Sequence, residues 1–213
     1  MSRWGNALPN REEILVTKRK AIIRAAAKVF NRRGSHGATL DDVAERLGVS
    51  KAALYRYVQS KQELLYACHE EAMDIARESI DKGEAEGRNG LEKIQIGMSG
   101  YLREMIGAMG VPVLIIEENA LTGAQADHII ALRDEFEKRM RGLVEEGIAD
   151  GSVLPLNPKI AMFMLLGAVH WVTKWYSPDG PWTANDVAEA LIELATRGLA
   201  AKPNDRLRAD IHA

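Results

Sequence analysis

The chain has 213 residues, of which 46% are hydrophobic, 27% charged and 6% aromatic, and this composition excludes a disordered or fibrous protein. Its formal net charge of −2 conceals an asymmetry, because residues 1–61 hold 13 Lys and Arg against 5 Asp and Glu, whereas the remainder holds 15 against 25. A basic N-terminal part on an acidic body suits a polyanion, since bound phosphates release their counterions, although a merely solvated basic face would carry the same charge.

Helical periodicity with clear start and stop signals predicts an all-α chain of about nine helices. Four of them are expected in the first part of the chain, at about 17–33, 40–47, 51–58 and 60–82. Thr39, Ser50 and Ser60 are suitable N-caps, because their hydroxyls can accept hydrogen bonds from the first helical N–H groups. Gly34 and Gly48 are expected to end the helices before them, since glycine accepts the left-handed backbone of a sharp turn.

After a glycine-rich break at 83–90, five further helical patterns follow, at 91–109, 112–120, 125–150, 158–176 and 184–198. Strand signals are nearly absent. We therefore expect a small head of three helices on a large helical body. The expected divisions of the chain are an N-terminal tail (1–17), a head (18–78), a body (79–201) and a C-terminal tail (202–213).

The spacing between Leu40 and Val58 is typical of a helix-turn-helix. Ala44 is a small residue where the two helices would cross, and Gly48 follows four positions later in the turn. Apolar residues are placed to lock the pair against the first helix: Val43, Leu47, Val49, Leu54 and Tyr57. The second helix would then present its other side to the major groove of DNA. A helix pair without a DNA role is the alternative until the flanks are considered.

With its flanks, this stretch resembles the TetR family of transcriptional repressors over about residues 18–78. The matching residues are Ile22, Ala25, Ala26, Phe30 and Gly34, then Thr39–Ala44, Gly48–Lys51, Leu54–Tyr57, and Ser60, Lys61 and Leu64. Two departures are Tyr57-Val58, where the family commonly has His-Phe, and Ala52-Ala53, where a glycine is common. The resemblance implies a homodimer that binds a palindromic operator in double-stranded DNA and is released by a small-molecule effector.

The resemblance also implies roles in DNA binding. Tyr55 and Lys61 look like the phosphate clamps of the family, with a core position as the alternative for Tyr55. Lys51, Ala52 and Arg56 are candidates for contact with base edges, and Arg56 could equally bind a phosphate. The expected DNA-binding residues are Thr39, Ser50, Lys51, Ala52, Tyr55, Arg56, Tyr57 and Lys61.

The body contains no catalytic or metal-binding motif, so we expect no enzyme activity, no metal and no cofactor. His69 beside Glu70 and Glu71 indicates a solvated helix face rather than a metal site. An enzyme or carrier that uses a helical cavity and a non-specific nucleoid-type binder are the alternatives from other classes. The single Cys68, the absence of a signal peptide at the N-terminus and the lack of a long apolar run favour a cytoplasmic protein without membrane contact.

Large, soft apolar residues recur at helical spacing in the body, and such surfaces adapt to varied apolar ligands, although plain core packing would use the same residues. The candidate ligand-binding residues are Met98, Tyr101, Met105, Met109, Phe163, His170, Trp171 and Trp175. The segment 167–181 is similar to TetR-like repressors of fatty-acid, aromatic-acid and sterol-ring breakdown, many of which respond to acyl-CoA thioesters and often carry Asn where His170 stands. The effector is therefore an acyl-CoA or another apolar molecule, with a multidrug-type repressor as the alternative.

The helices expected at 158–176 and 184–198 are candidates for a four-helix dimer interface. Small residues permit close approach there: Ala161, Gly167, Ala168, Ala188, Ala190 and Ala195. A ligand in the body would shift the long helix 60–82, and this shift would change the separation of the two recognition helices.

Overall fold

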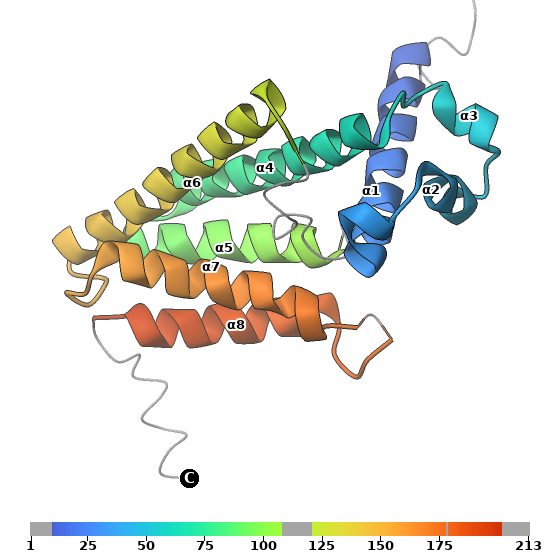
Figure 1. The fold of residues 1–213 in the computed structure, drawn as a ribbon. Coiled ribbons are helices and arrows are strands. Elements are labelled where there is room, and N and C mark those ends of the chain that lie inside the picture. Colours follow the sequence, from blue (N-terminus) through green and yellow to red (C-terminus); the bar gives the residue numbers. More distant parts are fainter. Residues whose placement is uncertain (1–9, 108–120, 178, 202–213) are drawn as a thin grey trace, which may run out of the picture.

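The computed structural model describes residues 10–107, 121–177 and 179–201, and these residues form eight helices (Figure 1). The all-α prediction is confirmed. The ninth expected helix, at 112–120, and Met109 lie outside the described residues. Extended pairing within them is limited to one isolated antiparallel bridge, Val153 to Ala200.

The first three helices form a head at one end of the molecule (Figure 1). They are α1 (Arg11–Gly37), α2 (Leu40–Leu47) and α3 (Lys51–Tyr55). Apolar residues from all three helices form the core of the head: Ala26, Ala27, Phe30, Val43, Ala44 and Leu54. Burial of these side chains is what holds so short a helix as α3 in place, because isolated helices of this length are unstable in water.

The regular part of α1 begins earlier than the expected Thr17. Asn10 Oδ1 accepts a 2.8 Å hydrogen bond from the Glu13 N–H, and Glu13 Oε2 accepts one of 2.9 Å from the Asn10 N–H. This reciprocal capping box satisfies two backbone donors and starts the helix at Arg11. Gly34 interrupts the helix with φ +72°, at the position where its end was predicted.

The turn between α2 and α3 is as predicted, but α3 is shorter. Gly48 ends α2 with φ +66°, and its N–H donates to the carbonyl oxygens of Ala44 and Glu45. After Tyr55 the chain leaves the helix in a turn, in which the N–H groups of Tyr57 and Val58 both donate to the Leu54 carbonyl oxygen. The expected helix 51–58 is therefore a five-residue helix followed by a turn.

Five helices form the body: α4 (Lys61–Glu86), α5 (Gly90–Gly107), α6 (Ala124–Ala149), α7 (Pro158–Trp175) and α8 (Ala184–Leu199). Helix α4 contacts α1 in the head and both α5 and α6 in the body, so that it joins the two parts (Figure 1). Helices α7 and α8 run side by side on the side of the body that faces away from α4 (Figure 1). None of the described helices is both long and apolar enough to cross a membrane.

Helix α4 continues past the break that was expected to begin at Gly83. A Cβ at Gly83 would collide with the Lys93 carbonyl oxygen, and Gly97 faces the Ser79 backbone in the same contact. These glycines let α4 and α5 approach closely, which is a packing role rather than a helix end. The chain between the two helices is accordingly short.

Candidate functional site

The helix caps of the head lie on its surface. Thr39 Oγ1 accepts a 3.2 Å hydrogen bond from the Asp42 N–H, and Ser50 Oγ accepts one of the same length from the Ala53 N–H. Both residues are exposed. The start of α3 therefore presents a hydroxyl and backbone N–H groups to solvent, which is the arrangement that suits a phosphate oxygen.

The outer face of α3 carries Lys51, Ala52 and Tyr55, all of them exposed. The Tyr55 side chain is 44% exposed, which excludes a core position. Lys51 Nζ lies 2.9 Å from Asp41 Oδ2 and 5.8 Å from the centroid of the Tyr55 ring. The hydrogen bond and the charge of Asp41 raise the pKa of Lys51. Because exposed ion pairs contribute little to folding, Lys51 can exchange this carboxylate for a phosphate or a base edge.

Arg56 and Tyr57 lie beyond the end of α3 and line a groove of about 680 Å³ with residues of α1 and α4. Tyr57 Oη accepts a 3.4 Å hydrogen bond from Lys18 Nζ, which draws its ring toward α1. Val58 takes the inward position instead. The predicted locking set is thus wrong for Val49 and Tyr57, which are exposed, and correct for Val43 and Leu54, which are buried.

Lys61, the expected second clamp, is half-buried at the start of α4. Its Nζ donates hydrogen bonds to the carbonyl oxygens of Ser35 (2.8 Å) and Ala38 (3.2 Å). An ammonium has three N–H donors, so one is left for a further acceptor. Lys61 therefore ties α4 to the connection between α1 and α2.

The candidate ligand-binding residues do not all come together. Met98, Tyr101 and Met105 are buried on α5, whereas Phe163 and Trp171 are 54% and 65% exposed on α7, with Trp175 also exposed. Phe163, Trp171 and Trp175 are among the exposed large apolar residues of α7, α8 and the loop between them, which together are called here the α7–α8 apolar face: Ile160, Phe163, Met164, Trp171, Trp175, Trp182 and Leu194. His170, also on α7, is half-buried.

His69 is buried, not solvated as expected from its acidic neighbours. It is 1% exposed, and its Nδ1 has no hydrogen-bond partner among the described residues. Burial lowers its pKa to about 4, with the charge of Arg133 on α6 acting in the same direction. Burial and Arg133 also lower the pKa of His170. Arg133 was not predicted as a site residue. Its spacing from the apolar residues Ile129, Phe136 and Met140 would have placed it on the inward side of α6.

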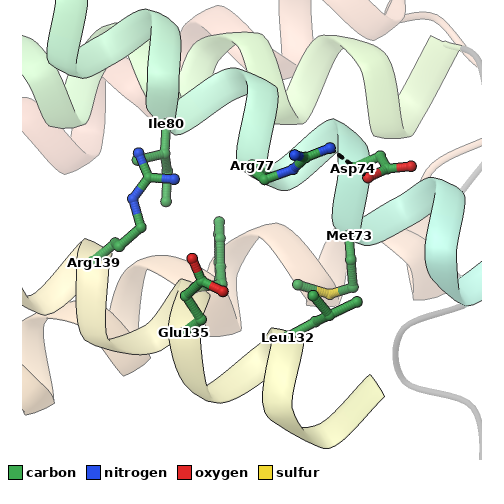
Figure 2. Close-up of a pocket in the computed structure, with 8 residues that line it drawn as sticks. Met73, Asp74, Arg77, Ile80, Leu132, Glu135 and Arg139 are labelled. Atoms are coloured by element: carbon green, nitrogen blue, oxygen red, sulfur yellow. Dashed lines mark hydrogen bonds and ion pairs between the residues drawn. The ribbon is translucent and has the colours of Figure 1, made fainter. Parts of the chain in front are cut away.

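A groove of about 330 Å³ lies between α4 and α6 (Figure 2). Its apolar lining includes Met73, Ile80, Leu132 and Phe136, and charged side chains stand at its rim. Each rim arginine is paired: Arg77 with Asp74 at 2.7 Å, and Arg139 with Asp81 and Glu84 at 2.7 Å each. The Phe136 ring lies 5.7 Å from that of Tyr101, so Phe136 separates the groove from the buried face of α5.

Among the described residues, no three His, Cys, Asp or Glu side chains gather where they could hold a metal ion. Residues 22–68 match the family model of bacterial regulatory proteins of the tetR family, and residues 87–199 match the tetracyclin repressor-like C-terminal domain. The chain belongs to the TetR family. This TetR-family chain is accordingly a transcriptional regulator and not an enzyme, as the sequence predicted.

Named relatives cover most of the chain. The transcriptional repressor KstR2 of Rhodococcus jostii is 27% identical over 195 residues, which are 88% of this TetR-family chain and 93% of the relative. The structure of AibR in complex with isovaleryl coenzyme A and operator DNA is 25% identical, with a TM-score of 0.69, over 83% of this chain and 97% of AibR. KstR2 of Mycobacterium tuberculosis, at 22% identity, shares the fold with a TM-score of 0.76, over 87% of this chain and 96% of KstR2.

Proposed function

We propose that this chain is a repressor that binds a palindromic operator as a homodimer and leaves it when an apolar effector, such as an acyl-CoA thioester, enters the body. The observation that carries the proposal is the exposed face of α3, with Lys51, Ala52 and Tyr55, in a head joined to the body by one continuous helix. A relative named as a repressor and a neighbour solved with isovaleryl coenzyme A and operator DNA support it.

The α7–α8 apolar face supports the dimer. Several large apolar side chains are exposed on these two helices, among them Phe163, Trp171 and Leu194, and exposed apolar patches mark protein interfaces. The same face of a second subunit would bury the α7–α8 apolar face, because a two-fold axis brings one surface against its own copy. A dimer also supplies the two recognition helices that a palindrome requires.

Helix α4 supports the response to an effector. In the body it packs against α5 and α6, and in the head Cys68 Sγ lies 3.5 Å from the Ile23 carbonyl oxygen of α1. A displacement of α4 in the body would therefore move the head as a unit. In a dimer such a movement changes the distance between the two copies of α3, and a fixed operator spacing then no longer fits.

A gel shift with DNA from upstream of the chain's own gene tests the DNA-binding part. We expect a complex that weakens as salt rises and that resists competition by random DNA. Binding that random DNA competes away as effectively as the specific fragment would identify a non-specific nucleoid-type binder instead.

Sedimentation of two variants tests the dimer. Trp171→Glu places a charge in the α7–α8 apolar face and should give monomers that bind the operator far more weakly. Ile130→Glu changes an equally apolar, 53% exposed residue of α6 outside that face and should remain dimeric. A dimeric Trp171→Glu variant with normal operator affinity would show that the face has another partner.

A further inference from the structure

Four helices of the body each contribute one buried or half-buried polar side chain to a shared region. These residues, called here the polar cluster, are His69 of α4, Tyr101 of α5, Arg133 of α6 and His170 of α7. His69 and Tyr101 are each 1% exposed. The ring of Phe136, one turn after Arg133 on α6, lies 5.7 Å from that of Tyr101, and Met73, one turn after His69 on α4, lines a groove together with Leu132, the neighbour of Arg133. The positive charge of Arg133 acts to lower the pKa of His69, Tyr101 and His170.

The register of α6 explains why Arg133, which is half-buried, lies on the inward side of the helix. Ile129 and Met140 are buried on this helix, and Phe136 packs against the ring of Tyr101. Arg133 follows Ile129 by four residues and precedes Phe136 by three, so it shares their inward stripe. A guanidinium keeps its charge at any physiological pH, and a charge on an inward stripe requires polar partners. Arg133 has an interaction of its own within the protein, and its five N–H donors allow it to add another.

His69 indicates that the polar cluster is incomplete. Buried polar atoms almost always have a hydrogen-bond partner, and His69 Nδ1 has none among the described residues. Leaving such an atom unpaired is unfavourable, so a buried group of this kind is expected where another molecule supplies the partner.

The chemistry of the polar cluster selects the ligand. Burial, assisted by Arg133, lowers the pKa of both histidines, so the imidazoles are neutral at physiological pH. The four members then carry one formal positive charge and offer guanidinium, phenol and imidazole donors. Such a set attracts a carboxylate or carbonyl oxygen and repels a cation.

We propose that the polar cluster binds the carboxylate or carbonyl oxygen of an acyl effector, while Met98 and Met105 contact its hydrocarbon chain. These methionines lie one helical turn on either side of Tyr101 on the buried face of α5. The inference rests on the proposed function, since it takes an effector in the body as given. To that function the inference adds the chemical group of the effector that the protein recognises, and it excludes cationic apolar drugs as effectors.

The groove of Figure 2 does not offer the same chemistry and supplies the control. Its Arg139 lies six residues after Arg133 on the same helix, but two carboxylates, those of Asp81 and Glu84, already neutralise it. An acyl oxygen would gain little there. Arg139→Met therefore removes the same kind of side chain from α6 without touching the polar cluster.

Calorimetric titration of the full-length protein with four eight-carbon probes tests the proposal. The probes are octanoate, octanoyl-CoA, octanol and octyltrimethylammonium. We expect octanoate or octanoyl-CoA to bind, octanol to bind more weakly and the cation not to bind. Binding of octanoate alone identifies a free acid as the ligand, and binding of octanoyl-CoA alone identifies the thioester.

Variants assign the binding to the polar cluster. Arg133→Met should weaken the acyl probe by about tenfold to a hundredfold, as expected for a lost hydrogen bond to a charged group, with operator affinity unchanged. Arg133→Lys should fall between, and Arg139→Met should match the wild type. If Arg133→Met fails to fold, Arg133→Lys and His69→Gln make the same test.

Equal affinity of the wild type and the Arg133 variants for the acyl probe would overturn the proposal, as would preferred binding of octanol or the cation. Failure of the wild type to bind either acyl probe would also overturn it. The gel shift separates that failure from failure of the proposed function, because sequence-selective operator binding does not depend on the identity of the effector.

Discussion

Lys61 Nζ lies 2.8 Å from the carbonyl oxygen of Ser35, so that the first residue of α4 is bonded to the end of α1. A single cation thus stands where the body's connecting helix meets the head. It can act on folding, by holding carbonyl groups that the ends of helices leave unpaired, and on DNA, by its charge.

Lys61→Ala separates these two roles. We expect a loss of about 1–3 kcal/mol in the free energy of unfolding, because hydrogen bonds from a charged donor are removed. If Lys61 also contacts phosphate, operator binding weakens for all sequences alike and the salt slope falls by about one. Urea denaturation and gel shifts at several salt concentrations measure these effects. Lys82→Ala, an exposed cation of α4 away from the head, is the control; an unchanged salt slope in Lys61→Ala would limit Lys61 to a structural role.

Substitutions on and after α3 distinguish affinity from base preference. Tyr55→Phe removes an exposed hydroxyl and should weaken binding of every DNA sequence by a similar factor. Arg56→Ala should change the ranking of operator variants if Arg56 reaches a base, with an effect of about 1–3 kcal/mol at one position. Binding of a set of single-base operator variants decides between the two. A uniform loss in Arg56→Ala would assign that side chain to the phosphate backbone.

Gly48→Ala tests the turn of the helix-turn-helix. A Cβ there meets nothing within 4 Å, so any cost comes from the backbone, whose φ is +66°. We expect a loss of about 1–2 kcal/mol, together with weaker operator binding. Gly142→Ala is the matched control, because its Cβ also meets nothing within 4 Å but its backbone is helical. There alanine should stabilise the protein by about 0.5–1 kcal/mol. Equal effects at the two positions would exclude a conformational cause.

Buried His69 makes stability depend on pH. Its pKa is lowered to about 4, from an ordinary value of 6.5, by burial and then by the charge of Arg133. Between these values the unfolded chain binds a proton and the folded chain does not, so the free energy of unfolding decreases as the pH falls from 6.5 to 4. The full effect is about 3 kcal/mol. His170, whose pKa is also lowered, acts in the same direction.

Urea denaturation between pH 7 and pH 4 measures this dependence, and His69→Gln should flatten it. The capping carboxylates Asp42 and Asp186 do not confuse the result, since their pKa values are lowered below the ordinary 3.8 by hydrogen bonds from Thr39 and Thr183. They lose their contribution only as the pH falls further. A variant with the wild-type slope would show that His69 is protonated in the folded protein.

Local signals account for what the sequence predicted well. Helix α2 has the expected bounds because Thr39 and Gly48 act on their immediate neighbours, and so does the start of α4 at Ser60. The start of α1 was predictable too, since Asn10 and Glu13 have the spacing of a capping box. The end of α4 was not, because Gly83 is explained only by the neighbouring helix α5.

The sites in the body depend on tertiary contacts. Helix α7 is apolar on nearly every side, so periodicity cannot tell that Met162 and Leu165 face inward while Phe163 and Met164 face solvent. The meeting of His69, Tyr101, Arg133 and His170 depends on how four helices pack, and the spacing within one helix carries no information about it. In the head, by contrast, the contacts span few residues, and the exposed face of α3 follows from the motif.

The placement of the tryptophans on the α7–α8 apolar face has an optical consequence. Trp171, Trp175 and Trp182 all lie there, and the rings of Trp175 and Trp182 stand edge to face with centroids 6.3 Å apart. In a Trp4→Phe protein these would be the only indoles, and their emission would come from one side of the molecule. Intrinsic fluorescence should then shift to shorter wavelength when a partner covers that side, and it offers a label-free measure of subunit exchange at concentrations too low for sedimentation.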